Sequence, residues 1–273
     1  MSTTYPVLFV SHGAPTFAIE PGLAGAKLAA LGKALPRPTA IVVVSPHWMT
    51  RTTVRIGAGD NPETIHDFGG FPEALYRLDY PAPGQPELAS RIQGLLTTAG
   101  WPAEVDTQRG LDHGAWVPLL HLLPEADVPV VQVSLPTPLD PAGALRLGQA
   151  LQPLRESGVL IVGSGSLTHN LYEFRAGHAP TAEYVTDFSD WIAEKLRERE
   201  IESLLDYRRL APEAARAHPS EDHLLPLFVA LGAAGEAYAM QLMEGGVTYG
   251  VLAMDSYLFG IPATLELTKT VTE

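Results

Sequence analysis

Four short runs of apolar, largely β-branched residues constrain the fold of this chain more than any other feature. They are residues 5–10, 39–44, 128–133 and 159–162, each bounded by Gly, Pro or Ser. Runs that are apolar at nearly every position, rather than at alternate ones, are typical of strands buried on both faces of a parallel sheet. The sequence therefore predicts several parallel strands inside a layered protein.

Helical patterns lie between the apolar runs, and the clearest cover residues 23–35, 140–156 and 181–200. The second begins at Asp140, a good N-cap, which is followed by a proline at the first helical position. Strands that alternate with helices in this way predict the α/β class. We expect a central, mostly parallel sheet with helices on both faces.

Nothing in the sequence marks a boundary between domains. There is no linker-like segment, internal repeat or low-complexity tract, and 273 residues suit one large α/β domain. We therefore expect residues 1–273 to form a single domain. Near the C-terminus, residues 236–243 and 247–254 predict a β-hairpin that turns at Gly245-Gly246.

Charge and composition exclude several classes of protein. The formal net charge of −13 repels phosphate backbones and anionic lipids, so neither nucleic acid nor a membrane surface is an expected partner. No apolar run reaches the length of about 18 residues that spans a membrane, and no signal-peptide pattern is apparent, so a cytoplasmic protein is expected. Because the chain has no cysteine, any metal must be held by nitrogen and oxygen ligands.

The positions of three histidines indicate a site at one edge of the predicted sheet. His12 and His47 directly follow two of the predicted strands, and His169 follows a third after the residues 163–166, which we interpret as a flexible, tight Gly-Ser turn. Ligands of open α/β sheets bind beyond the carboxyl ends of the strands. The three side chains should therefore converge, provided that their strands are near neighbours.

Two more histidines stand at predicted helix starts. His113 precedes a helical run, and His223 falls in the first turn of a helix for which Ser220 is a plausible N-cap. A helix N-terminus favours the neutral imidazole, the form that binds a metal. The other four histidines are expected to have the ordinary surface or hydrogen-bonded role of a lone histidine: His66, His121, His178 and His218.

Seven segments of the chain together resemble one enzyme family. They are Ser11–Pro15, Ser45–Trp48, His66–Pro72, Tyr80–Gly84, Leu111–Trp116, Gly163–Asn170 and Glu221–Pro226. In this order they resemble the signature segments of extradiol dioxygenases of the DOPA 4,5-dioxygenase type. Those enzymes belong to the class III ring-opening superfamily, and the resemblance runs from the N-terminus to about residue 260.

The resemblance implies a role for each of the five histidines. By position, His12, His47 and His223 match the metal ligands, and His169 matches an acid/base residue that can also approach as a fourth ligand. His113 matches a second active-site histidine. The wider superfamily typically has a glutamate as third ligand, so this chain departs from the usual carboxylate-containing iron site. Iron(II) is the metal expected for catalysis, and an all-histidine site can also take zinc(II).

The activity implied by the resemblance is extradiol cleavage of a catechol-type, DOPA-like ring with dioxygen. Two alternatives remain open on the residues alone: a zinc-dependent hydrolase, and a catalytically silent metal-binding protein on the same scaffold. The long irregular segment 58–84, rich in Gly and Pro, predicts a lid over the site. The aromatic side chains that could wall the substrate ring, or simply pack in the core, are Trp48, Phe68, Phe71 and Tyr80.

Overall fold

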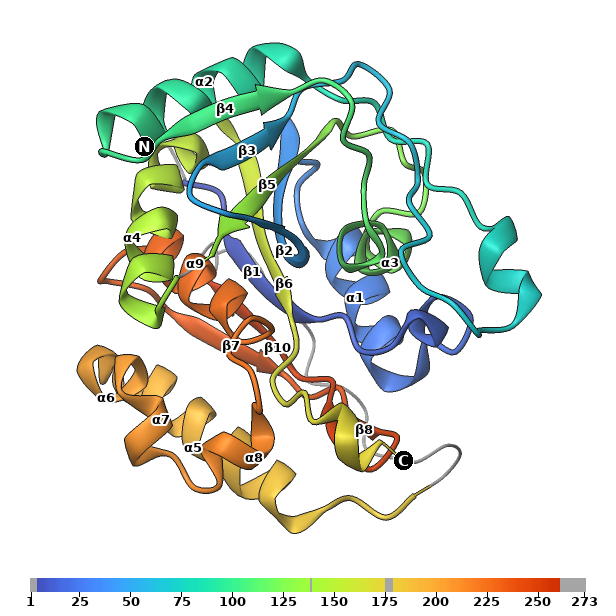
Figure 1. The fold of residues 1–273 in the computed structure, drawn as a ribbon, viewed down its shortest axis with the longest axis vertical. Helices are drawn as coiled ribbons and strands as arrows, with labels where there is room; N and C mark the ends of the chain where they lie inside the picture. The colour runs from blue at the N-terminus through green and yellow to red at the C-terminus, as the bar shows by residue number, and fades with distance from the viewer. Residues whose placement is uncertain (1–3, 138, 175–178, 261–273) are drawn as a thin grey trace.

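A central sheet runs through the computed structural model, which describes residues 4–137, 139–174 and 179–260 (Figure 1). Within these residues its eight strands have the order β4-β3-β5-β2-β6-β1-β10-β7. The strands are β1 (Val7–Ser11), β2 (Ala40–Thr50), β3 (Val54–Gly57), β4 (Ala103–Asp106), β5 (Val130–Pro136), β6 (Val159–Gly165), β7 (Met240–Met243) and β10 (Ser256–Phe259). The four predicted strands correspond to β1, β2, β5 and β6.

The middle of the sheet is parallel, as the apolar runs predict. Strand β2 pairs in parallel with both β5 and β6, and β6 pairs in parallel with β1. Antiparallel pairs lie toward the edges, where β1 meets β10, β10 meets β7 and β3 meets β5. The predicted α/β fold is therefore confirmed, and the carboxyl ends of β2, β6 and β1 lie side by side.

Helices cover both faces of this sheet. The helices of the described residues are α1 (Gly22–Ala34), α2 (Pro86–Thr98), α3 (His113–Leu122), α4 (Pro141–Leu151), α5 (Glu183–Glu198), α6 (Ile201–Leu205), α7 (Tyr207–Leu210), α8 (Ala214–Ala217) and α9 (Leu225–Ala234). Short 3-10 helices span Pro15–Ala18, Glu73–Arg77, Gln152–Ser157 and Leu171–Glu173. Figure 1 shows α4 and α9 on one face and α1 and α3 on the other. Among the described residues, no helix has the length and apolar character that crossing a membrane requires.

Helix α9 packs against α4 and β6 at glycines that let the backbones approach closely. A Cβ atom on Gly148 of α4 would lie 2.0 Å from the carbonyl oxygen of Val229, and one on Gly163 of β6 would lie 2.1 Å from that of Pro226. Residues 163–165 therefore continue strand β6, and the predicted tight turn at 163–166 is wrong. The glycines allow the backbone of α9 to pack closely against β6, and α9 is buried along its whole length.

We expect Gly148→Ala to destabilise the fold, because the added methyl group must push α4 away from α9. Overpacking of this kind costs about 1–3 kcal/mol of unfolding free energy. Gly94→Ala in α2 is the matched control, since its added Cβ would meet nothing within 4 Å. That substitution should instead stabilise the protein by about 0.5–1 kcal/mol through helix propensity. Urea unfolding of both variants measures the difference, and equal stabilities would contradict the packing argument.

Three local predictions are corrected by the structure. The helix predicted over 140–156 ends at Leu151 and continues as a 3-10 helix, because Pro153 cannot donate a helical hydrogen bond. The predicted hairpin at Gly245-Gly246 is wrong, since β7 pairs with β10. A smaller hairpin forms between β8 (Val247–Thr248) and β9 (Leu252–Ala253). A Cβ on Gly245 would lie 2.0 Å from the carbonyl oxygen of Met254. Gly245 therefore packs against the backbone that follows β9 and is not the turn of a hairpin.

Candidate metal centre

Five of the nine histidines gather beyond the carboxyl ends of β1, β2 and β6. They are the five singled out in the sequence: His12, His47, His113, His169 and His223. The ring centroids of His12 and His47 lie 5.1 Å apart, and His223 lies 5.5 Å from His12 and 5.1 Å from His47. The expected convergence follows because β2, β6 and β1 are neighbours in the sheet.

His12, directly after β1, is held in one tautomer by a serine on β6. Its Nδ1 lies 3.0 Å from Oγ of Ser164, and the Ser164 hydroxyl donates to the carbonyl oxygen of Gly114. Because the serine proton is committed to that carbonyl, the hydrogen-bond network assigns the imidazole proton to Nδ1 of His12. Its Nε2 therefore carries a free lone pair in a fully buried position.

His47 lies inside β2 rather than after it. The pairing of β2 with β5 shifts between Val44 and Met49, and Pro46 in this stretch has no N–H for the ladder. The strand continues past this irregularity, which the apolar pattern does not reveal. Nε2 of His47 lies 3.2 Å from Nε2 of His12. Two ring nitrogens at this distance share either a proton or a cation.

His223 precedes α9, and it does not lie in the first turn of a helix capped by Ser220 as predicted. The helix begins two residues later, at Leu225, with a proline at its first turn. Nδ1 of His223 donates to Oδ2 of Asp222 at 2.5 Å, and its Nε2 is buried without a hydrogen-bond partner. A buried polar atom left without a partner is unusual and indicates an absent ligand or ion.

His113 is the first residue of α3, as predicted. Asp112 is the N-cap and accepts a hydrogen bond from the backbone of Ala115. The side chain of Asp67, from the segment 58–84, accepts from both the backbone N–H and Nδ1 of His113, at 2.8 and 3.0 Å. Its Oδ2 also lies 3.6 Å from Nδ1 of His47. Burial opposes ionisation of Asp67, but the hydrogen bonds from His113 lower its pKa to about 2.

His169 stacks on His223 with ring centroids 3.5 Å apart and an interplanar angle of 6°. The segment before it is firmly held rather than flexible, contrary to our expectation. Leu167 donates its N–H to Ser11 and accepts from Nε2 of His218, and the N–H of His169 donates to Ala217. Rotation of the His169 side chain, and not movement of its backbone, is the freedom that remains.

Burial and mutual repulsion keep these rings neutral. Burial first, and then the neighbouring histidines, lower the pKa of His47 to about 2 and that of His169 to about 3. The same causes move the pKa of His12 well below its ordinary value. Neutral imidazoles crowded together, with Nε2 of His12 and His47 facing each other and Nε2 of His223 without a partner, are suited to binding a divalent cation.

The residues present therefore fit a mononuclear metal ion. Among the described residues, potential ligand atoms of His12, His47 and His113 all lie within 4.8 Å of one another. His223 offers the other candidate for third ligand, because its Nε2 is buried without a hydrogen-bond partner. The ligand set His12, His47 and His223 stays a prediction.

The remaining histidines have ordinary structural roles, as expected, where the structure describes them. His66, His121 and His218 each place Nε2 within 3.0 Å of a carbonyl oxygen, of Leu78, Phe17 and Leu167 respectively. His178 lies outside the described residues.

Sequence reasoning missed the polar side chains that hold the site, namely Asp67, Arg109, Asp112, Gln132, Ser164 and Asp222. Only Asp67, Asp112 and Asp222, each beside a histidine in the resembling segments, left a visible signal.

The segment 58–84 borders the histidine cluster. Phe68 lies edge-on to the ring of His113 at 5.7 Å and contacts Phe71 at 5.5 Å, so both could wall a bound ring. Tyr80 is buried in the core and donates its hydroxyl to the carbonyl oxygen of Leu123, which is the packing alternative we left open. Trp48 is also buried, beneath the guanidinium of Arg109.

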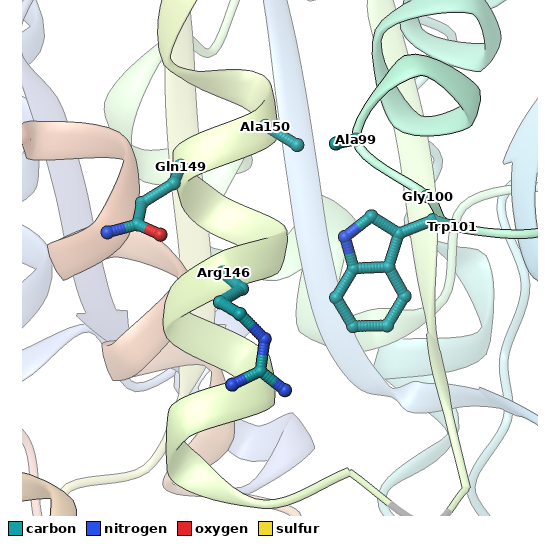
Figure 2. A pocket seen from close by; sticks show the side chains of 6 residues that line it. All are labelled: Ala99, Gly100, Trp101, Arg146, Gln149 and Ala150. Atoms are coloured by element: carbon teal, nitrogen blue, oxygen red, sulfur yellow. The ribbon is translucent and has the colours of Figure 1, made fainter.

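A separate cleft of about 530 Å³ opens between the end of α2 and α4 (Figure 2). Trp101, Arg146 and Gln149 supply its larger side chains, and none of the five clustered histidines lines it. Figure 2 shows Arg146, Gln149 and Ala150 on α4, with the indole ring of Trp101 across from Ala150. This cleft is therefore distinct from the candidate metal centre.

Comparison with known proteins places the fold and the histidine cluster in one class of enzyme, the aromatic ring-opening dioxygenases. Residues 9–260 match the family described as the catalytic LigB subunit of aromatic ring-opening dioxygenase, and the chain belongs to this family. It is accordingly an oxidoreductase of the extradiol dioxygenase class. This result favours the dioxygenase over the hydrolase and the silent metal-binding protein.

Several relatives are similar over almost their whole length. A protein of Beta vulgaris named 4,5-DOPA dioxygenase extradiol is 41% identical over 255 residues, which cover 92% of this chain and 95% of that one. A protein of the same name from Escherichia coli K12 is 38% identical, with 95% and 96% covered. A crystal structure of an uncharacterized protein from Escherichia coli K12 superposes with a TM-score of 0.77 at 32% identity, covering 93% of this chain and 99% of that one.

Proposed function

We propose that residues 1–273 form a single catalytic domain that cleaves a catechol-type ring, such as that of DOPA, beside its diol with dioxygen. The observation that carries the proposal is the buried cluster of His12, His47 and His223, whose Nδ1 atoms all face polar partners and leave Nε2 for a metal. The relatives named 4,5-DOPA dioxygenase extradiol support the choice of substrate class. The partners are then a small aromatic diol and dioxygen.

In this proposal His12, His47 and His223 hold one iron(II) ion, and zinc(II) can occupy the same site. When bound, iron(II) supplies the redox chemistry that allows dioxygen to react with the diol. The chain fixes the geometry. Ser164 and Asp222 set the tautomers of His12 and His223, and second partners of this kind orient metal-binding imidazoles.

His169 is the residue proposed to move protons. Its ring stacks on that of His223 beside the cluster, so a ring nitrogen can accept a proton from a diol bound there and return it later. His113 is proposed to orient the substrate. Its Nδ1 is hydrogen-bonded to Asp67, so its Nε2 is the ring nitrogen left to contact the substrate. Phe68 and Phe71, on the segment 58–84, are placed to pack against an aromatic ring and exclude water.

Oxygen consumption tests this function directly. The protein loaded with iron(II) in the presence of a reductant should consume dioxygen when DOPA or a simple catechol is added, and should form a coloured semialdehyde. Protein treated with a chelator, or loaded with zinc(II), is the control and should consume none. Stoichiometric iron without oxygen uptake across a panel of catechols would overturn the proposal.

A further inference from the structure

Asp67 is the one acidic side chain of the segment 58–84 for which the structure gives contacts to two histidines of the cluster. Its Oδ1 accepts the backbone N–H of His113 at 2.8 Å, and its Oδ2 lies 3.0 Å from Nδ1 of the same ring. That Oδ2 also faces Nδ1 of His47 at 3.6 Å. A single carboxylate thus joins this segment to β2 and α3.

The chemistry of a carboxylate decides the tautomer of each ring. An ionised carboxylate only accepts hydrogen bonds, so Nδ1 of His113 must carry the proton and Nε2 must carry the lone pair. The same Oδ2 favours a proton on Nδ1 of His47, although at 3.6 Å the contact is electrostatic rather than a full hydrogen bond. Both rings then offer Nε2 lone pairs, and Nε2 of His47 already faces His12.

The helix cap does not account for this arrangement. Asp112 is the N-cap of α3, so the helix start has its own capping side chain. Phe68, the next residue after Asp67, lies against the ring of His113 at 5.7 Å, and Trp116 of α3 donates its indole N–H to Ile65. Asp67 therefore lies where the segment 58–84 meets the site, directly before the phenylalanine that contacts His113.

We propose that Asp67 is a positioning residue, whose carboxylate fixes the tautomers of His113 and His47 and couples the segment 58–84 to metal binding. This inference rests on the proposed metal centre and adds a residue to it. Asp67 would act on metal affinity through the proposed ligand His47, because loss of a second partner to a metal-binding histidine typically lowers metal affinity 10–100-fold. The carboxylate side chain is only 22% exposed, so solvent cannot readily replace it.

The test is Asp67→Asn in the full chain, with Asp60→Asn as the matched control. Asp60 lies in the same segment, and its contact with Gly84 is made by the backbone carbonyl oxygen, so this change removes the same charge from an exposed side chain. An asparagine at position 67 can turn an N–H toward Nδ1 of His113 and so favours the opposite tautomer. We expect the zinc(II) dissociation constant, measured by chelator competition, to rise about 10–100-fold for Asp67→Asn and less than about twofold for the control.

A second readout separates positioning from a general loss of structure. The ¹⁵N shifts of the His113 ring in the metal-free protein should report a proton on Nδ1 in the wild type and on Nε2 in Asp67→Asn. Metal should also protect residues 58–84 from hydrogen exchange in the wild type but not in this variant. If Asp67→Asn does not fold, Asp67→Glu keeps the charge and should retain more affinity than Asp67→Ala.

The outcomes distinguish this inference from the proposed function. Zinc affinity and His113 tautomer unchanged in Asp67→Asn would overturn the role of Asp67 while leaving the metal centre intact. A wild-type protein that binds neither zinc(II) nor iron(II) would instead overturn the proposed function. If Asp67→Asn and Asp60→Asn lost zinc affinity equally, the loss would come from the change in net charge, and the positioning role of Asp67 would be rejected.

Discussion

His47→Ala should give a folded protein that holds almost no metal. Nε2 of His47 lies 3.2 Å from that of His12, at the centre of the cluster, and its removal leaves a proposed three-histidine site with two protein ligands. Loss of a direct ligand removes most of the binding free energy, because the remaining rings cannot complete the coordination sphere. Elemental analysis after incubation with iron(II) and desalting should find about one ion per wild-type chain and less than about a tenth of that in the variant.

His121→Ala is the control for this measurement. Its ring bonds to the carbonyl oxygen of Phe17 and takes no part in the cluster, so the variant should keep its metal even if its stability falls. If His47→Ala still bound a full complement of metal, His47 would not be a metal ligand. The same analysis of His223→Ala and His113→Ala decides the third ligand, and we expect the first to lose the ion and the second to retain most of it.

The sequence predicts the sheet well and its fine structure less well. Apolar runs identify buried parallel strands because the signal is local, but the continuation of β2 through Pro46 to Thr50 depends on pairing with β5. The glycines at 163 and 165 illustrate the same limit. They look like turn residues, yet each is required by a carbonyl oxygen from the segment 223–226, a contact between positions about 60 residues apart in sequence.

The candidate site is predicted in part by chain position and in part by resemblance. The apolar runs that precede His12 and His47 predict that the two meet, and they do so because β1, β6 and β2 are consecutive in the sheet, an order that the sequence does not display. His223 and His113 come from segments whose approach to the sheet is a tertiary property; their predicted helix-start positions singled them out, and the resemblance supplied their roles. Asp67 and Ser164 act through hydrogen bonds across long sequence separations, so no local pattern could assign their roles.

His169→Ala should separate proton transfer from metal binding. The ring of His169 stacks on that of His223 at 3.5 Å, and its backbone is tied to Ala217, so the side chain stays beside the site. We therefore expect His169→Ala to keep most of its iron and to lose turnover by roughly a hundredfold or more, the usual scale for a general acid or base.

Metal content and oxygen uptake, measured side by side for His169→Ala and His47→Ala, test this separation. If His169→Ala is as metal-free as His47→Ala, then His169 is a ligand and the proton-transfer role passes to His113. If it keeps both its iron and its full turnover, the proposed mechanism is wrong. Retained iron with low turnover is the expected result, because removing a ring that only stacks on His223 leaves the Nε2 atoms of His12, His47 and His223 in place.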